Sequence, residues 1–445
     1  MNAPGFLLSP RLRRHYAAAQ ERLASLPHIS DEDWARRQLD ALQRVWADAC
    51  TDVPYYAGLV ASGRAPAEVK TWRDVQSIPE LTREALRTHR QQFIRRSGPP
   101  PGFVRTAGST GTPLSIGMGP AERDLMRVVK LSAWAEFGYT PASRVFLIWG
   151  HAHLLGTGAR GRVKQFTRVV ADRLLGYRRV NAYRLNAEIC RHYAEELIAF
   201  RPLALISYAA ALDVFARYTE AFRDRFRALG LRFVLATAEA PPRPDTVTRL
   251  EDLFGCPVVE EYGGAEFGQV AFGRSGAPFD VYSDLNYLEC MATGDASAAL
   301  VTSLYPRYVP LIRYRVGDAL IGPTRLSNGH VRRFEAVAGR VNDAVRLDGG
   351  DLVHSVAVFH CIHQEDQVHA IQLLLDDAGI EVSLVAGDHD RSSMERRIRE
   401  RLRQVHPTLG HARFHYVDDL QTTGAGKRRW FIDRRSQQPS EAFRV

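Results

Sequence analysis

The sequence has 445 residues, of which 45% are hydrophobic and 24% are charged. This composition is ordinary for a globular protein, and the length allows two or three domains, so a disordered chain and a disulfide-stapled miniprotein are excluded. Its 59 lysines and arginines stand against 50 acidic residues, which gives a net charge of +9. A basic chain favours anionic partners, but no nucleic-acid-binding motif accompanies the dispersed arginines, so we expect no nucleic-acid partner.

No stretch approaches the ~18 apolar residues that a membrane span needs, so we expect no membrane span. The first residues, MNAPGFLLSPRLRRHY, lack the apolar core of a secretory signal. The five cysteines have no C-x-x-C spacing, which argues against a zinc or redox motif. We therefore expect a reduced, cytoplasmic protein.

Helical periodicity opens the chain over residues 11–26 and 31–50, and a short helix is expected after Leu81, with Thr82 as its N-cap. Further along, short apolar strands alternate with helices. The strands are expected at 144–149, 203–207 and 231–236, and the helices at 187–200 and 211–229. This alternation predicts an α/β domain around a largely parallel, buried sheet.

Shorter strands and more turns follow residue 280, and a smaller unit begins after residue 339. In that unit we expect a hairpin formed by 370–375 and 381–385, an amphipathic helix over 394–405 and a strand at 413–417. The predicted architecture is a large N-terminal α/β domain, 1–340, and a small C-terminal α+β domain, 341–445. A small second domain of this size suits a mobile lid.

A loop rich in glycine, serine and threonine occupies residues 106–113 (TAGSTGTP). Glycines let backbone amides converge on an anion, and the hydroxyls add donors for phosphate oxygens. The loop lacks the Gly-Lys-Ser/Thr ending of a Walker A motif. Taken alone, it is as typical of a turn as of a phosphate site.

Two acidic motifs follow. Residues 261–266 (EYGGAE) come after a strand-like stretch and present Glu266 on a tight turn, which suits Mg²⁺ held on nucleotide phosphates. Residues 313–318 (RYRVGD) place Asp318 after a glycine turn, where its carboxylate can accept hydrogen bonds from ribose hydroxyls. Each carboxylate also fits an ordinary turn.

Two basic motifs complete the series. Arg340 lies in residues 339–343 (GRVND), at the expected junction of the two domains, and Lys427 ends the glycine-rich loop 423–427 (TGAGK). Singly, Arg340 fits a surface ion pair and Lys427 fits a solvated tail.

In this order, the five motifs resemble those of the adenylate-forming superfamily, which contains acyl- and aryl-CoA synthetases, adenylation domains and luciferases. Within it, the sequence is most similar to the phenylacetate-CoA ligase branch, which includes the CapK-like proteins. The short chain and three segments carry that closer resemblance: 53–56 (VPYY), 78–86 (IPELTREAL) and 238–241 (AEAP). The likeness extends from Val53 to Lys427.

The resemblance implies an enzyme, a ligase that uses ATP, Mg²⁺ and coenzyme A. A carboxylate attacks the α-phosphorus of ATP, releases pyrophosphate and gives an acyl adenylate, and the thiol of coenzyme A then displaces AMP. Glu266 would bind Mg²⁺, and Lys427 would bridge the attacking carboxylate and the α-phosphate. Asp318 would bind the ribose, and Arg340 would steady the ribose or phosphate. The other residues implied to bind ATP are Ser109, Thr110, Gly111, Thr112, Glu239, Tyr262 and Gly263.

The sequence departs from the family pattern at a few positions. Leu114 and Ser115 follow Pro113 where relatives commonly carry a lysine, and the hinge between the domains is Asn342 in place of Asp or Lys. Asparagine tolerates unusual backbone angles, so a hinge is retained there.

The acid substrate is encoded only weakly. Trp149 and His151 at one strand end, Tyr208 at another, and Gly264 can line the acyl site, because open α/β sheets bind ligands at strand ends. Aromatic walls with small residues suit a flat aryl acid. Ordinary core packing is the alternative for each of these residues.

The final acceptor stays open. Coenzyme A leads, and the alternatives are an amine, a carrier-protein thiol or another nitrogen nucleophile, including nitrite activation for N–N bond formation. A catalytically silent nucleotide sensor is a hypothesis of a different class. The sequence does not determine the oligomeric state, and a homodimer is compatible with it.

Overall fold

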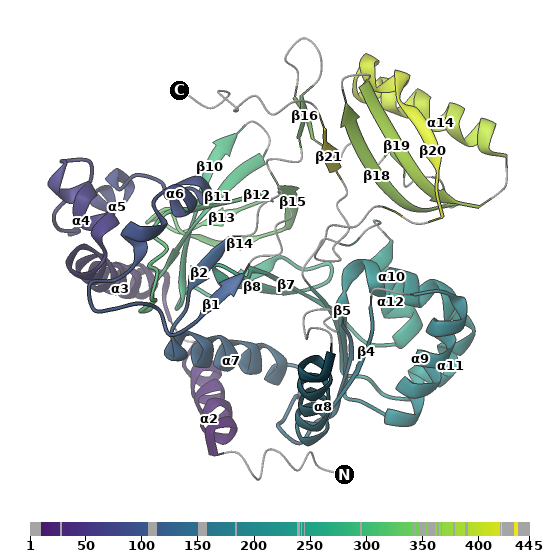
Figure 1. The fold of residues 1–445 in the computed structure, drawn as a ribbon, viewed down its shortest axis with the longest axis horizontal. Coiled ribbons are helices and arrows are strands. Elements are labelled where there is room, and N and C mark those ends of the chain that lie inside the picture. The colour runs from purple at the N-terminus through teal and green to yellow at the C-terminus, as the bar shows by residue number, and fades with distance from the viewer. Residues whose placement is uncertain are drawn as a thin grey trace. The chain divides into compact units, whose positions relative to one another are not determined.

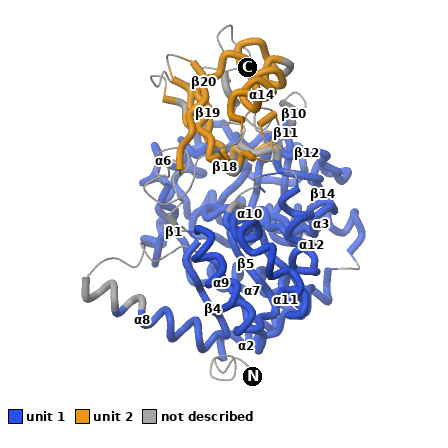
Figure 2. The backbone as a smooth tube through the Cα atoms, turned by 90° about the vertical axis from the view of Figure 1, so that its right-hand side faces the viewer, with its two compact units in different colours: residues 1–106, 114–316, 320–337 blue, residues 107–113, 317–319, 338–445 orange. Residues whose placement is uncertain are grey.

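The computed structural model describes residues 10–26, 29–105, 114–149, 158–182, 185–237, 241, 243, 245–293, 296–340, 344–346, 352–354, 361–362, 365, 367–376, 379–387, 390–418, 420 and 431–434. Two compact units divide the chain (Figure 2). Unit 1 comprises 1–106, 114–316 and 320–337, and unit 2 comprises 107–113, 317–319 and 338–445. The α/β fold with a large N-terminal and a smaller C-terminal part is as the sequence predicts.

Helices dominate the first hundred residues. They are α2 (Pro10–Ser25), α3 (Asp31–Asp52), α4 (Pro54–Ala61), α5 (Trp72–Ser77), α6 (Arg83–Thr88) and the 3₁₀ turn η1 (Arg90–Phe93). Local capping fixes where several begin: the Ser30 hydroxyl accepts from the Asp33 amide, and the Thr82 hydroxyl accepts from the Ala85 amide. The predicted Thr82 cap is confirmed, whereas the sequence reasoning missed α4 and α5.

A nine-stranded sheet forms the centre of unit 1 (Figure 1). In spatial order its strands are β13 (Thr324–Arg325), β14 (Val331–Phe334), β9 (Phe279–Val281), β8 (Gly268–Arg274), β7 (Val258–Gly264), β6 (Phe233–Thr237), β5 (Ala204–Tyr208), β3 (Val145–Ile148) and β4 (Tyr177–Val180). The run from β7 to β4 is parallel, and the pairs from β7 to β13 are antiparallel. The predicted parallel sheet is therefore one half of a mixed sheet.

Helices cover both faces of the parallel half. On one face pack α9 (Ala187–Phe200), α10 (Ala209–Tyr218), α11 (Arg223–Arg227) and α12 (Thr246–Phe254), around a core that includes Phe146, Leu205 and Val234. On the other face, α7 (Pro120–Ala135) and α2 enclose a core that includes Leu147, Phe233 and Val259. Burial on both faces explains why these strands read as continuous apolar runs.

Two smaller sheets accompany the nine-stranded sheet. A four-stranded sheet has the order β10 (Asn286–Thr293), β11 (Ala296–Ser303), β12 (Tyr314–Ile321) and β15 (Ala336–Arg340), and β1 (Phe103–Arg105) pairs with β2 (Ser115–Gly117). The core beside the four-stranded sheet joins α3 and α4 to its strands through Trp46, Tyr56, Tyr287 and Tyr314.

Unit 2 contains a four-stranded sheet and one long helix. The sheet order is β20 (Arg413–Tyr416), β19 (Gly379–Ala386), β18 (Val368–Asp376) and β21 (Phe431–Asp433), and a small pair joins β16 (Ala344–Arg346) to β17 (Leu352–His354). Helix α14 (Arg391–Val405), followed by the 3₁₀ turn η5 (Pro407–His411), buries Met394, Ile398 and Leu402 against β18 and β19. The hairpin of β18 and β19, the amphipathic helix α14 and the strand β20 are as predicted, whereas β21 was not predicted.

Two local predictions are wrong. The helix expected over 211–229 is interrupted, because the chain leaves helical geometry at Thr219 between α10 and η3 (Glu220–Phe222), and α11 begins only at Arg223. Residues 313–318 do not form a turn. Gly317 has φ +86° inside strand β12, so Asp318 is a strand residue and not the residue after a turn.

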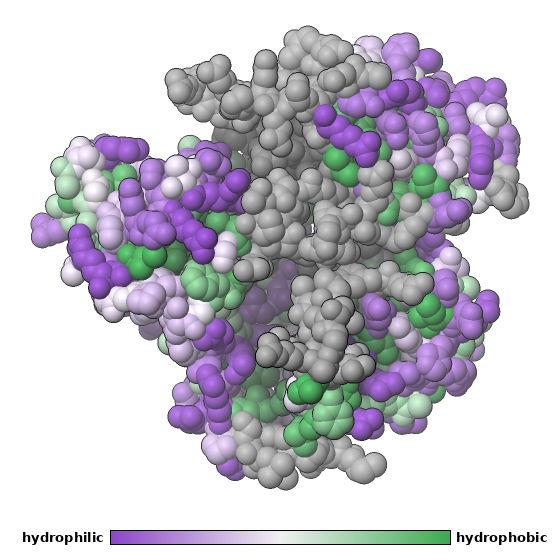
Figure 3. Space-filling model, viewed as in Figure 1, coloured by the Kyte–Doolittle hydropathy of each residue, from purple (hydrophilic) through white to green (hydrophobic). Residues whose placement is uncertain are grey.

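One helix exposes apolar side chains. On α8 (Gly158–Leu174), Val163, Phe166, Val169, Val170 and Leu174 are exposed. Figure 3 shows apolar, green surface low on the face that it draws. Within the described residues, no helix is both long and apolar enough to cross a membrane.

Candidate active site

The β7–β8 hairpin carries the acidic turn that the sequence analysis singled out. Glu266 lies in that turn and its residue is only 6% exposed. The Arg83 guanidinium, at the first position of α6, lies 3.1 Å from the Glu266 carboxylate, and the Tyr314 hydroxyl donates to the same oxygen at 3.5 Å. The Glu266 carboxylate is therefore aimed inward and already faces a cation.

The glycines of this hairpin are required by close packing. A Cβ on Gly263 would lie 2.4 Å from the backbone oxygen of Gly268, and a Cβ on Gly264 would lie 2.4 Å from the Phe267 ring. Tyr262 is buried and meets the Phe334 ring edge-on at 5.6 Å. The structure thus brings Tyr262, Gly263 and Gly264 at the end of β7 together with Glu266 in the following turn.

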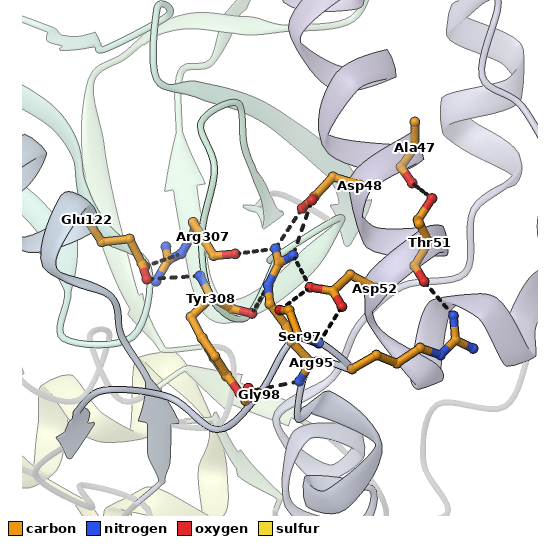
Figure 4. A network of polar contacts seen from close by, with 11 residues as sticks. Ala47, Asp48, Thr51, Asp52, Arg95, Ser97, Gly98, Glu122, Arg307 and Tyr308 are labelled. Carbon is orange, nitrogen blue, oxygen red and sulfur yellow. Dashed lines mark hydrogen bonds and ion pairs between the residues drawn. The ribbon is translucent and has the colours of Figure 1, made fainter.

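Arg307 joins the hairpin to Glu122, and its contact with Glu122 is drawn in Figure 4. Its guanidinium donates to the Glu266 backbone oxygen at 2.6 Å and lies 3.1 Å from the Glu122 carboxylate, with both side chains almost fully buried. The other Glu122 oxygen accepts from the backbone amides of Gly119 and Tyr308. The contacts span sequence separations that local patterns do not reveal, so the sequence analysis missed Arg307.

The network extends to the N-terminal helices. Arg95 donates to the Arg307 backbone oxygen at 2.7 Å and forms ion pairs with Asp48 and Asp52 of α3 (Figure 4). Hydrogen bonds from Ser97 and Arg95 lower the pKa of Asp52 to about 2. These contacts tie α3 to the segment that supports the Glu266 turn.

The arginines of the 313–318 motif are structural. Arg313, at φ +48°, donates to the backbone oxygens of Gln76 and Ile78 at 2.7 Å each, and Arg315 pairs with Glu80. They hold the segment before α6 against the start of β12. The segment that contains Arg83 is thereby fixed beside the hairpin. Asp318 is half-buried on β12.

Two of the acyl-site candidates meet. Trp149 follows β3, Tyr208 ends β5, and their rings stack at 4.3 Å with an interplanar angle of 21°. Both are half-buried at the carboxyl edge of the parallel strands, where α/β sheets bind ligands. The two aromatic side chains are in contact there, and their place in an acyl site stays a prediction.

The remaining candidates lie outside the described residues, or are described in the backbone alone. Arg340 is the last residue of β15, and its side chain is outside the description. The candidates outside the described residues are Ser109, Thr110, Gly111, Thr112, His151, Glu239, Asn342 and Lys427.

The number of neighbouring carboxylates bears on how a magnesium ion could be bound. Within the described part of the chain, no group of three or more His, Cys, Asp or Glu side chains is placed to hold a metal. Mg²⁺ is commonly bound by one or two carboxylates together with substrate phosphates. Glu266 offers one such carboxylate, and in this structure it is paired with Arg83.

Similarity to known proteins extends over nearly the whole chain. No protein-family model matches the sequence. Protein CapK of Staphylococcus aureus is 20% identical over 392 residues, which cover 85% of this chain and 84% of that protein. A crystal structure of 2-hydroxyisobutyryl-CoA ligase in the postadenylation state with 2-HIB-AMP gives a TM-score of 0.68 at 17% identity, and it covers 91% of this chain and 90% of that one.

The chain has the fold of the adenylate-forming enzymes. A second structure of the same ligase, with 2-HIB-AMP and CoA in the thioesterification state, covers 93% of this chain and 91% of that one, at 18% identity and a TM-score of 0.57. The shared fold confirms the predicted α/β architecture with a large N-terminal and a smaller C-terminal part.

Proposed function

We propose that the protein is an ATP-dependent ligase that activates a carboxylic acid as its acyl adenylate and transfers the acyl group to coenzyme A. The observation that carries the proposal is the full-length likeness to a ligase whose structures contain an acyl-AMP and CoA. The inward Glu266 carboxylate on a rigid turn, where the family motif expects it, supports the proposal independently.

The first half-reaction needs positioning and charge neutralisation. A carboxylate oxygen of the acid forms a bond to the α-phosphorus of ATP while the bond to pyrophosphate breaks. In this scheme Ser109, Thr110, Gly111 and Thr112 bind the β- and γ-phosphates, and Lys427 neutralises the charge that develops at the α-phosphate. Mg²⁺, when bound, neutralises phosphate oxygens, and Glu266 would hold it.

Ribose and adenine contacts complete the scheme. Asp318 accepts from the ribose hydroxyls, Arg340 steadies the ribose or phosphate, and Glu239, Tyr262 and Gly263 border the nucleotide. In the second half-reaction the CoA thiolate attacks the acyl carbonyl carbon, and AMP leaves. The domain 341–445 would turn about Asn342 between the two half-reactions.

The acid that we propose is flat and aromatic. The stacked Trp149 and Tyr208 rings at the carboxyl edge of the sheet support this assignment, because a planar ring packs well against such a wall. Within the proposal, Gly264 and His151 complete the acyl site.

The test is acid-dependent exchange of pyrophosphate into ATP, over a panel of aryl, alkyl and amino acids. We expect Lys427→Ala to slow exchange by at least ~100-fold, because it removes a cation from the developing charge. Lys70→Ala is the matched control, since this exposed lysine pairs only with Glu68 in the described structure and is expected to leave exchange unchanged. Glu266→Gln is expected to raise the Mg²⁺ concentration needed for exchange.

Parallel reactions with coenzyme A, hydroxylamine or nitrite identify the acceptor by mass spectrometry of the product. A thioester in the coenzyme A reactions supports the proposal in full. If exchange occurs without a thioester, and another nucleophile gives a product, the adenylation step stands and only coenzyme A is replaced as the acceptor. ATP binding without exchange for any acid would overturn the ligase and favour a nucleotide sensor.

A further inference from the structure

A row of side chains at the carboxyl edge of the sheet continues from the aromatic wall toward the acidic turn. The strand register sets Tyr208 beside Thr237 and Thr237 beside Glu261. Residues that are aligned in this way project from the same face of a sheet. Tyr208 and Thr237 are the last residues of β5 and β6, so Glu261 lies level with the edge where ligands bind.

Glu261 combines a deep position with partial access to solvent. Burial raises the pKa of its carboxyl above the ordinary value, and the Lys130 ammonium of α7 and two hydrogen bonds partly offset that rise. As whole residues, Glu261 and Gln269 nevertheless keep intermediate exposure, although the Gln269 side-chain oxygen is buried. A charged group inside the unit is therefore within reach of a small molecule.

Several buried polar atoms near this carboxylate lack a hydrogen-bond partner within the described residues, among them the Tyr282 hydroxyl, which interacts electrostatically with Glu261. The Gln269 side-chain amide and the Thr237 hydroxyl, the latter at 3.4 Å, donate to Glu261. The side-chain oxygens of Gln269 and Asn286 are both buried and have no hydrogen-bond partner in the described structure. Asn286 joins the group because its amide donates to the Gln269 backbone oxygen at 3.1 Å.

A buried acceptor without a donor is costly, so a built cluster of them indicates a donor supplied from outside. Glu261 and Gln269 stand on the two arms of the hairpin whose turn carries Glu266. Glu261 and Gln269 therefore belong to the same hairpin as Glu266, the proposed metal ligand. The row of side chains that leads to them starts at the stacked Trp149 and Tyr208 rings.

We propose that Glu261, with Gln269 and Asn286, selects acids whose acyl part carries an amino or hydroxyl group, which donates hydrogen bonds to this cluster. The inference rests on the proposed function and names its substrate class. A carboxylate and two amide oxygens match N–H and O–H donors, whereas a methyl group in the same place leaves the Gln269 and Asn286 oxygens unpaired. Glu261 is a specificity-determining residue in this assignment.

The experiment compares matched acids in pyrophosphate exchange: aminobenzoates and hydroxybenzoates against the methylbenzoates of the same substitution pattern, and hydroxy-substituted against methyl-substituted aliphatic acids. For the wild-type protein we expect kcat/KM to favour the donor-bearing acid by about 100-fold or more, because sites built to bind a donor reject analogues that lack it. Glu261→Leu is expected to bring that ratio below ten, and Glu261→Gln to restore part of it.

Glu260→Leu is the matched control. Glu260 is the preceding residue of β7, burial raises the pKa of its carboxyl too, and strand alternation directs it to the opposite face. We expect its substitution to leave the ratio unchanged. Urea unfolding of both variants separates a loss of specificity from a loss of stability.

A wild-type ratio within threefold of one, or an equal change in both leucine variants, overturns the inference. Exchange that depends on Lys427 but ignores the donor leaves the ligase intact and removes only Glu261 from its assigned role. If no acid supports exchange, calorimetric titration of the same acid pairs in the presence of a non-hydrolysable ATP analogue decides the matter. Equal or absent binding of the two acids in that titration also overturns the inference.

Discussion

Replacing Arg307 with methionine tests the network beneath the Glu266 turn. The Arg307 and Glu122 side chains are 1% and 2% exposed and their charged atoms are 3.1 Å apart. Removing the cation leaves a buried carboxylate without its counter-charge, which costs about 3–5 kcal/mol. That loss is a large part of the 5–15 kcal/mol that stabilises a typical domain.

The assay is urea unfolding of the large unit, followed by tryptophan fluorescence. Arg36→Met is the control, because this arginine is exposed, pairs with Asp33 one helical turn away, and is expected to contribute under about 0.5 kcal/mol. The double variant Glu122→Gln/Arg307→Met is expected to recover about 1–2 kcal/mol, since an amide oxygen still accepts a backbone N–H and carries no charge. A loss under 1 kcal/mol for Arg307→Met, or no recovery in the double variant, would refute the reasoning.

Three further predictions concern the hairpin and two titrating groups. Gly263→Ala should lower the free energy of unfolding in urea by about 2 kcal/mol or more and abolish exchange, because the new Cβ would meet the Gly268 backbone oxygen. Gly58→Ala on α4 is the control, since its Cβ would meet nothing within 4 Å, and it should be neutral or stabilising. Equal effects of the two substitutions would contradict this prediction. Burial lowers the pKa of His330 to about 3, so the unfolded chain binds the extra proton and stability should fall by about 1.4 kcal/mol per pH unit from pH 6.5 toward 3. His330→Asn should flatten that slope, and identical slopes would count against it. Because hydrogen bonds lower the pKa of Asp52 to about 2, the stabilisation from its ionised carboxylate is present above pH 4 and is lost between pH 4 and 2. Asp52→Asn should remove roughly 1–2 kcal/mol of that acid-sensitive stability. An unchanged acid-unfolding transition in this variant would disprove the prediction.

Local signals predicted the local structure well. The Thr82 cap and the buried positions Met394, Ile398 and Leu402 follow from short-range hydrogen bonding and helical spacing, and the structure confirms them. The break at Thr219 was not predicted, because the apolar periodicity continues on both sides of it while the backbone leaves helical geometry for a single residue.

Contacts between residues far apart in the sequence could not be predicted, and this limited the prediction of the candidate site. The motif placed Glu266 on a turn, but the pairing of Glu266 with Arg83 joins positions 183 residues apart. No periodicity distinguishes Arg83 or Arg307 from the other basic residues in the sequence, because their roles depend on which strands become neighbours. The antiparallel half of the large sheet was missed for the same reason.

The attachment of the N-terminal helices to strands much later in the chain has a consequence during synthesis. Arg22 on α2 pairs with Asp284, 262 residues further on, and Gln38 on α3 donates to the Ser283 backbone oxygen. At a typical 5–20 residues per second, α2 leaves the ribosome roughly 13–50 s before its partner exists. Over that interval α2 and α3 can pack only on helices made earlier, α7 and α4, so the polar contacts that tie them to residues 283–284 form among the last in this unit.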